Sequence, residues 1–92
     1  MTIGKEIISE IKNIDDENFY GYVYVSSDFS EDQVKNVINE LNSMTIITLK
    51  NVETFSFTVL MNSDNDYQYN VELVNGLDDD VFFRIDRSIK TV

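Results

Sequence analysis

The second half of the chain alternates large apolar and mostly polar side chains with a period of two. Over residues 53–61 every second side chain is apolar, from Phe55 to Met61. Residues 67–74 and 81–86 repeat the pattern. Successive side chains of a strand point to opposite faces, so this period fits strands that bury one face rather than amphipathic helices. The pattern restricts the chain to folds built on a sheet with one covered face.

Two earlier segments extend this sheet. Residues 19–25 also alternate, with three tyrosines on one face. Phe19, Val23 and Val25 share the other face, which we expect to point into the core. Residues 44–50 are rich in β-branched side chains and form the next predicted strand.

Two further segments have helical spacing. Isoleucines that recur at helical intervals predict an amphipathic helix over residues 2–13. A second helix is predicted over residues 30–42. It begins at Ser30, and Gln33, three residues later, completes a capping box.

The predicted order of elements is α-β-α-β-β-β-β within one domain of 92 residues. Polar turns at residues 62–66 and at Asn75-Gly76 join the last strands as hairpins. We therefore expect an α+β fold in which two helices pack on one face of a four- to five-stranded, mostly antiparallel sheet. A right-handed crossover through the second helix would also allow strands 19–25 and 44–50 to lie parallel.

The charge of the chain restricts its partners. The sequence holds 17 Asp and Glu residues against 7 Lys and Arg, which gives a net charge of −10. Proteins that bind nucleic acid directly need clustered basic side chains, so direct nucleic-acid binding is not expected. Anionic membrane surfaces are disfavoured for the same reason. The hydrophobic fraction of 42% is typical of a folded domain.

Most catalytic chemistry is also excluded. The chain has no His and no Cys, which removes the imidazole base, the thiol nucleophile and nearly all zinc chemistry. Asp64-Asn65-Asp66 opens like a calcium loop, but Tyr69 stands where that loop needs glycine and Asn75 where it needs a bidentate Glu. The sequence therefore predicts a protein that is not an enzyme and holds no metal or cofactor.

Acidic side chains gather at the ends of the predicted elements. They are Asp15, Asp16, Glu17, Asp28, Glu31, Asp32, Asp64, Asp66, Asp78, Asp79 and Asp80. Each cluster alone is explained as a solubility device or as a charge at a helix terminus. Together they give a field of one sign, which steers and docks a basic surface. Both interpretations stay open, and the second makes these residues candidates for partner binding.

The tyrosines Tyr20, Tyr22 and Tyr24 are the remaining candidates. If the Phe19 face of their strand is buried, the tyrosines lie half-exposed on the open side of the sheet. Tyrosine is enriched at binding hot spots because it offers a large contact area with few rotatable bonds and a polar tip. The alternatives are that the first helix covers the row, or that aromatic pairing across strands explains it.

Residues 8–13, Ile-Ser-Glu-Ile-Lys-Asn, follow a Met-x-Ile start. This segment resembles the first helix of small acidic anti-CRISPR proteins that inhibit an RNA-guided nuclease, and the size, acidity and composition of the chain are similar to that group. The resemblance covers one helix and carries no functional residue over. It implies a phage-encoded protein that occludes a basic nucleic-acid channel by DNA mimicry.

Three functions are compatible with these features. The first is a non-enzymatic inhibitor of anti-CRISPR or anti-restriction type that binds the basic nucleic-acid-binding surface of a bacterial defence enzyme. The second is an immunity protein that neutralises a cognate basic toxin. The third is a structural or adaptor domain that dimerises through an exposed edge strand at residues 67–74. The chain would be a monomer or homodimer, and without a signal-peptide pattern or a membrane-spanning run we expect it in the cytoplasm of a bacterial host.

Overall fold

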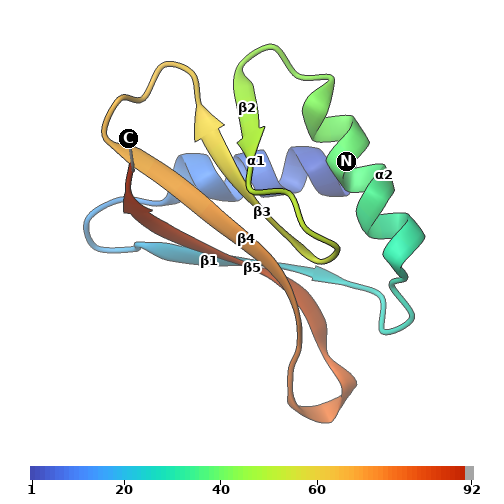
Figure 1. Ribbon diagram of the computed structural model, residues 1–92. Coiled ribbons are helices and arrows are strands. Elements are labelled where there is room, and N and C mark those ends of the chain that lie inside the picture. The colour runs from blue at the N-terminus through green and yellow to red at the C-terminus, as the bar shows by residue number, and fades with distance from the viewer. Residues whose placement is uncertain (91–92) are drawn as a thin grey trace.

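A five-stranded antiparallel sheet carries two helices in the computed structural model, which describes residues 1–90 (Figure 1). The helices are α1 (Ile3–Asn13) and α2 (Glu31–Asn42). The strands are β1 (Tyr20–Val25), β2 (Ile47–Lys50), β3 (Ser56–Met61), β4 (Tyr67–Asn75) and β5 (Val81–Ile89). A 3₁₀ turn, Leu77–Asp79, lies between β4 and β5. This arrangement confirms the predicted α+β fold and the order of its elements.

The strands lie in the order β1-β5-β4-β3-β2, and every neighbouring pair is antiparallel. Hairpins join β2, β3, β4 and β5 in sequence, which leaves free edges at β2 and β5, and β1 pairs with β5, where Val25 faces Val81. The predicted parallel pairing of residues 19–25 with 44–50 is therefore wrong, because β1 and β2 form opposite edges of the sheet (Figure 1). The edge strand predicted at residues 67–74 is also wrong, since β4 lies between β3 and β5.

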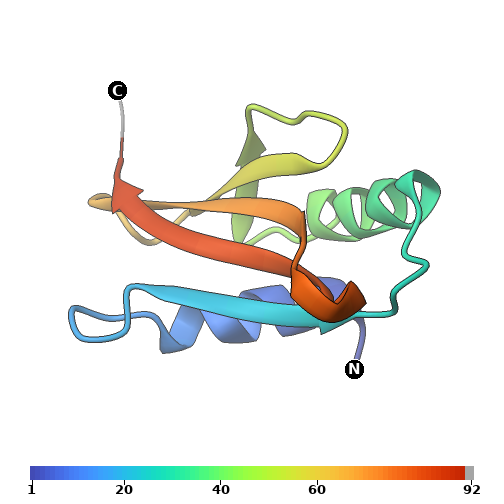
Figure 2. The same cartoon turned by 90° about the horizontal axis from the view of Figure 1, so that it is seen from below.

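One core joins both helices to the inner face of the sheet. The buried residues that form it include Ile7, Ile8, Ile11, Val34, Val37, Leu41, Phe57, Val59, Val71, Phe83 and Ile85. Helix α1 runs alongside β1 on this face (Figure 2). Because both helices contribute their apolar stripes to the same core, the opposite face of the sheet is left open.

Two phenylalanines that the alternation assigns to the core lie outside it. Phe19 is 56% exposed and Phe55 is 46% exposed. Each comes immediately before the first residue of its strand, and its carbonyl still continues the ladder: Phe19 accepts from the Arg87 N–H at 3.1 Å and Phe55 from the Leu73 N–H at 2.9 Å. The prediction is wrong for these two positions because the periodicity gives the face of a side chain but not whether the core extends to the end of the strand.

Both helices begin at side-chain caps. In α2 the predicted capping box is confirmed: the Gln33 N–H donates to Ser30 Oγ at 3.3 Å, and the Ser30 N–H donates to Gln33 Oε1 at 2.7 Å. In α1 the cap is Thr2, whose hydroxyl accepts from the Lys5 N–H at 3.3 Å. No helix in the described part of the chain is both long and apolar enough to cross a membrane.

Candidate partner-binding surface

Aromatic side chains form a continuous row on the open face of the sheet. The aromatic row consists of Tyr20, Tyr22, Tyr24 and Phe82, and the exposed ring of Phe19 meets its Tyr20 end with centroids 5.6 Å apart. The rings of Tyr22 and Phe82 meet edge to face with centroids 5.1 Å apart, and Tyr24 lies 5.4 Å from Phe82. These contacts place the rings in register along the β1–β5 edge of the sheet.

The tyrosines of this row are accessible. Tyr20 is 48% exposed, Tyr22 is 40% exposed and Tyr24 is 63% exposed. Helix α1 packs on the other face of β1, so the alternative in which that helix covers the tyrosines is wrong. Cross-strand aromatic pairing does occur, because Tyr24 lies directly opposite Phe82 on β5. Pairing orders the rings and leaves their outer faces free.

Two of the predicted acidic clusters come together at one end of the sheet. The pairing of Val25 with Val81 brings the β1–α2 connection beside the β4–β5 hairpin (Figures 1 and 2). Ser27 of the connection and Asp79 of the hairpin line the same hollow, of about 310 Å³. We call this region the acidic end, and its exposed carboxylates belong to Asp28, Glu31, Asp32, Asp78, Asp79 and Asp80.

No carboxylate of the acidic end forms an ion pair within residues 1–90. The ion pairs within residues 1–90 join Arg84 to Asp86 and Arg87 to Asp16, and neither lies there. Lys35 follows on the next turn of α2, but it forms no ion pair in the described part of the chain. The last pair of the β1–β5 ladder at this end is Val25 with Val81, and Tyr24 with Phe82 is the pair before it. The aromatic row therefore reaches the acidic end.

The other acidic clusters lie at the opposite end and have structural roles. Asp15 Oδ1 accepts from the backbone N–H groups of Glu17 at 2.9 Å and Asn18 at 2.7 Å. These two bonds, that of Asn18 first, hold the pKa of Asp15 below its ordinary value. Asp64 Oδ1 accepts in the same way from the N–H groups of Asp66 at 2.8 Å and Tyr67 at 3.2 Å. These aspartates close turns.

A half-buried arginine neutralises part of the charge at this second end. Arg87 Nη2 lies 2.8 Å from Asp16 Oδ1, and its guanidinium stacks 4.0 Å above the ring centre of Tyr67. The hydrogen bond to Asp16 raises the pKa of Arg87. Lys90 also donates from Nζ to the Asp64 carbonyl at 3.0 Å. The predicted acidic residues therefore divide between two ends of the molecule and do not form one face.

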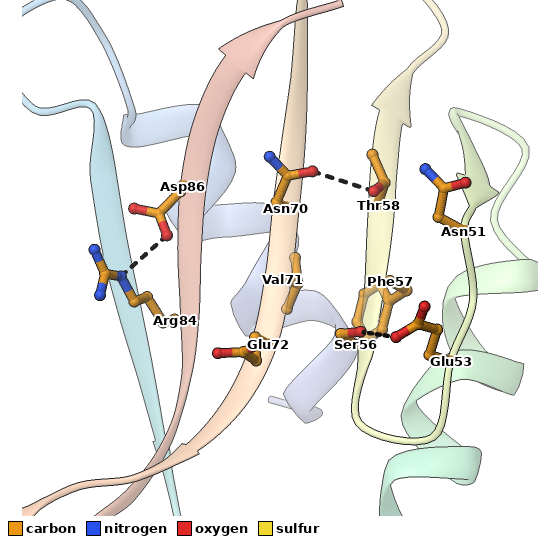
Figure 3. Close-up of a pocket in the computed structure, with 10 residues that line it drawn as sticks. All are labelled: Asn51, Glu53, Ser56, Phe57, Thr58, Asn70, Val71, Glu72, Arg84 and Asp86. Carbon is orange, nitrogen blue, oxygen red and sulfur yellow. Dashed lines mark hydrogen bonds and ion pairs between the residues drawn. The ribbon is translucent and has the colours of Figure 1, made fainter. Parts of the chain in front are cut away.

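A polar hollow on the open face was missed by the sequence analysis. It has a volume of about 320 Å³ and lies over β3, β4 and β5, bounded by Asn51 and Glu53 from the β2–β3 connection (Figure 3). Glu72 stands opposite Arg84 across the β4–β5 pair, but Arg84 Nε pairs with Asp86 Oδ2 at 3.0 Å. The signal in the sequence is the set of polar side chains that alternate with the apolar ones along β3, β4 and β5. They identify the hollow only once the strand order is known.

The hydroxyl groups of the polar hollow are hydrogen-bonded to neighbouring side chains. In residues 1–90, no three His, Cys, Asp or Glu side chains converge as they would around a metal ion. The Thr58 hydroxyl donates to Asn70 Oδ1 at 3.2 Å and the Ser56 hydroxyl donates to Glu53 Oε2 at 3.4 Å, so hydroxyl protons in the hollow are held by neighbouring side chains.

Comparison with known proteins adds no relative, because no protein-family model, no curated protein and no solved structure matches the chain.

Proposed function

We propose that this domain is a non-catalytic binding protein that docks its aromatic row and acidic end onto a basic surface of a partner protein. The observation that carries the proposal is the row itself: three tyrosines, each at least 40% exposed, lie side by side on a sheet face that no helix covers. An isolated exposed aromatic is common, but an ordered row forms a continuous apolar patch of the kind found at interfaces.

The two parts of the surface have different roles. Tyrosine rings supply contact area at low entropic cost, and they stack well on guanidinium groups. The acidic end supplies carboxylates that form no ion pair within residues 1–90, and such charge accelerates encounter with a basic partner and suppresses wrong partners. A partner with arginine-rich loops would satisfy both parts at once.

The most specific form of the proposal concerns the partner. Protein surfaces that bind nucleic acid are basic and present arginines to phosphates and bases. A domain of net charge −10 that occupies such a surface would block nucleic-acid binding in the partner. This is the action implied by the resemblance to anti-CRISPR proteins, and on this proposal the chain works in the cytoplasm of a bacterial host against a defence enzyme.

Capture followed by displacement tests the proposal. The tagged chain is incubated with bacterial lysate at low and high salt, and each captured protein is purified. We expect a nucleic-acid-binding protein that salt releases, and we expect the chain to displace labelled duplex DNA from it. Capture of a toxin that does not bind nucleic acid would favour the immunity-protein alternative and overturn the inhibitor.

Matched variants locate the surface. Asp78→Asn with Asp79→Asn removes two charges from the acidic end, and Asn tolerates the left-handed backbone at both positions, where φ is 59° and 62°. The control, Glu17→Gln with Asp66→Asn, removes two charges from the opposite end. Tyr22→Ser with Tyr24→Ser is expected to weaken displacement more than the first pair does. Equal loss from the charge pair and its control would reject a localised surface.

A further inference from the structure

The outer edge of β1 lacks the features that keep most edge strands from pairing. Exposed edges are usually blunted by Pro, by inward charges, by Lys or by shortness. β1 reads Tyr-Gly-Tyr-Val-Tyr-Val over six residues, with no charge and no proline. The opposite edge, β2, has only four residues and ends in Lys50. The molecule therefore leaves one edge open to a further strand and shortens the other.

The hydrogen-bonding groups of this edge can be assigned from the register. The Arg87 N–H donates to the Phe19 carbonyl at 3.1 Å, and residues 19 and 87 continue the register of the β1–β5 pair. Hydrogen-bonded pairs alternate along an antiparallel ladder. The backbone groups of Gly21, Val23 and Val25 therefore face β5, and those of Tyr20, Tyr22 and Tyr24 face outward. In residues 1–90 no loop or side chain bonds these outward groups.

A groove of about 300 Å³ runs beside this edge, between α1 and β1. Helix α1 contributes Glu6, Ser9 and Glu10, and β1 contributes Tyr22 and Tyr24. Both glutamates are half-buried, and neither forms an ion pair or a side-chain hydrogen bond in the described part of the chain. The groove lining has no Lys or Arg.

Gly21 explains how a carboxylate reaches the strand edge. A Cβ atom at this position would lie 2.9 Å from Glu10 Oε2, so the glycine leaves the space that the carboxylate occupies. Carboxylate oxygens without hydrogen-bond partners are free to accept from a cation in the groove, and such charge-assisted hydrogen bonds are strong. The groove is therefore complementary to Lys or Arg side chains.

We propose that the edge of β1 binds an extended basic segment of a partner protein, which adds to the sheet as a further strand and places Lys or Arg side chains against Glu6 and Glu10. Alternate side chains of such a strand would enter the groove, and the intervening ones would lie beside the tyrosines. A second copy of this chain fits less well, because pairing of two β1 edges would bring like-charged glutamates together. The inference rests on the strand edge and holds for a partner that does not handle nucleic acid.

Amide exchange with synthetic peptides tests this inference. The probe is acetyl-Lys-Thr-Lys-Thr-Lys-Thr-Lys-amide, and the control replaces each Thr by Pro, which keeps the charge but removes the Thr N–H groups that would face β1. We expect the probe to slow exchange of the Tyr20, Tyr22 and Tyr24 amides by about tenfold or more, since exchange then requires dissociation. Slowing by the proline control as well, or shifts confined to the acidic end, would show non-specific charge attraction and overturn the proposal.

Two pairs of variants distinguish the contribution of backbone hydrogen bonds to peptide binding from the contribution of the glutamate charges. Tyr22→Pro removes an outward N–H without a ladder bond to β5, and Tyr22→Val removes the same ring but keeps that N–H. We expect Tyr22→Val to bind the probe and Tyr22→Pro to fail, with both folded by circular dichroism. Glu6→Gln with Glu10→Gln should weaken binding about tenfold, whereas the charge-matched control Glu53→Gln with Glu72→Gln should leave it within about twofold.

Analytical ultracentrifugation of the chain alone tests whether a second copy occupies the β1 edge. A dimer that forms without peptide, and that blocks the probe, would assign the edge to a second copy and overturn the proposal. The peptide experiment uses no nucleic-acid-binding protein. A negative result with the peptide would therefore overturn strand addition at β1 but not the proposed function, which the displacement of DNA tests separately.

Discussion

At the residue scale, several carboxylates of this acidic chain serve as hydrogen-bond acceptors for backbone N–H groups. Glu40 of α2 reaches the start of α1, where its Oε1 accepts from the Gly4 N–H at 3.0 Å and its other oxygen accepts from the Thr2 hydroxyl. A Cβ at Gly4 would lie 2.4 Å from Glu40 Oε1, so the glycine makes this approach possible. An anion at a helix N-terminus is stabilising because of the helix dipole.

Replacement of this carboxylate tests its role. Glu40→Ala removes both hydrogen bonds and the charge at the N-terminus of α1, and we expect a loss of about 1–2 kcal/mol in the free energy of unfolding. Urea denaturation followed by circular dichroism measures it. Asn39→Ala, an exposed change on the same turn of α2, is the control and should stay within about 0.5 kcal/mol of the parent. Equal losses for the two variants would contradict the capping role.

Asp15 predicts a dependence on pH. Its pKa is lowered in the folded state by the backbone N–H groups of Asn18 and Glu17, so the charged form is favoured by folding. The stabilisation is complete above the ordinary pKa of an aspartate and is lost as the pH falls through the lower folded value. Asp15→Asn should therefore be less stable than the parent at neutral pH, and the difference should shrink as the pH falls below the ordinary pKa of an aspartate. A difference that does not shrink there would contradict this sign.

At the element scale, the start of α2 combines a capping box with two acidic residues in the first turn. Ser30→Ala removes the acceptor for the Gln33 N–H and should cost about 1 kcal/mol of stability. Ser27→Ala, an exposed serine in the same connection, is the matched control. Thermal unfolding of the two variants side by side measures the difference, and a loss shared by both would assign the effect to the connection rather than the cap.

The individual helices and strands were predictable from the sequence, whereas the way they lie next to one another in space was not. The cap at Ser30 depends on residues three apart, and the tyrosine face of β1 follows from a period of two, so both were predicted correctly. The pairing of Arg87 with Asp16 joins residues 71 apart, and no local pattern encodes it. The division of the acidic clusters between two ends and the polar hollow over β3–β5 depend on strand order, which the sequence analysis left open.

At the scale of the whole molecule, the net charge of −10 acts over dimensions of 36 × 29 × 24 Å. The screening length is about 30 Å at 0.01 M salt and about 3 Å at 1 M, so at low salt each carboxylate is repelled by most of the others. Added NaCl should therefore raise the free energy of unfolding over this range.

The acidic end should contribute most to this salt dependence, since its carboxylates have no ion pairs in residues 1–90. Asp78→Asn with Asp79→Asn is expected to raise stability at low salt and to flatten the increase with NaCl. The same two-charge change at Glu17 and Asp66 should have a smaller effect, because Arg87 and Lys90 lie at that end. Denaturation at a series of NaCl concentrations distinguishes them, and stability that falls with salt would show that the ion pairs dominate instead.

The pairing of β1 with β5 also has a consequence for biosynthesis. The strand that carries three of the tyrosines is translated before the other strands, and its neighbour in the sheet of residues 1–90, Val81–Ile89, is translated after them. During elongation the tyrosine strand has no ladder to join, so it stays unpaired on the ribosome while β2, β3 and β4 are made. On the proposed binding mode, a nascent chain that lacks residues 81–89 would not yet present the ordered aromatic row.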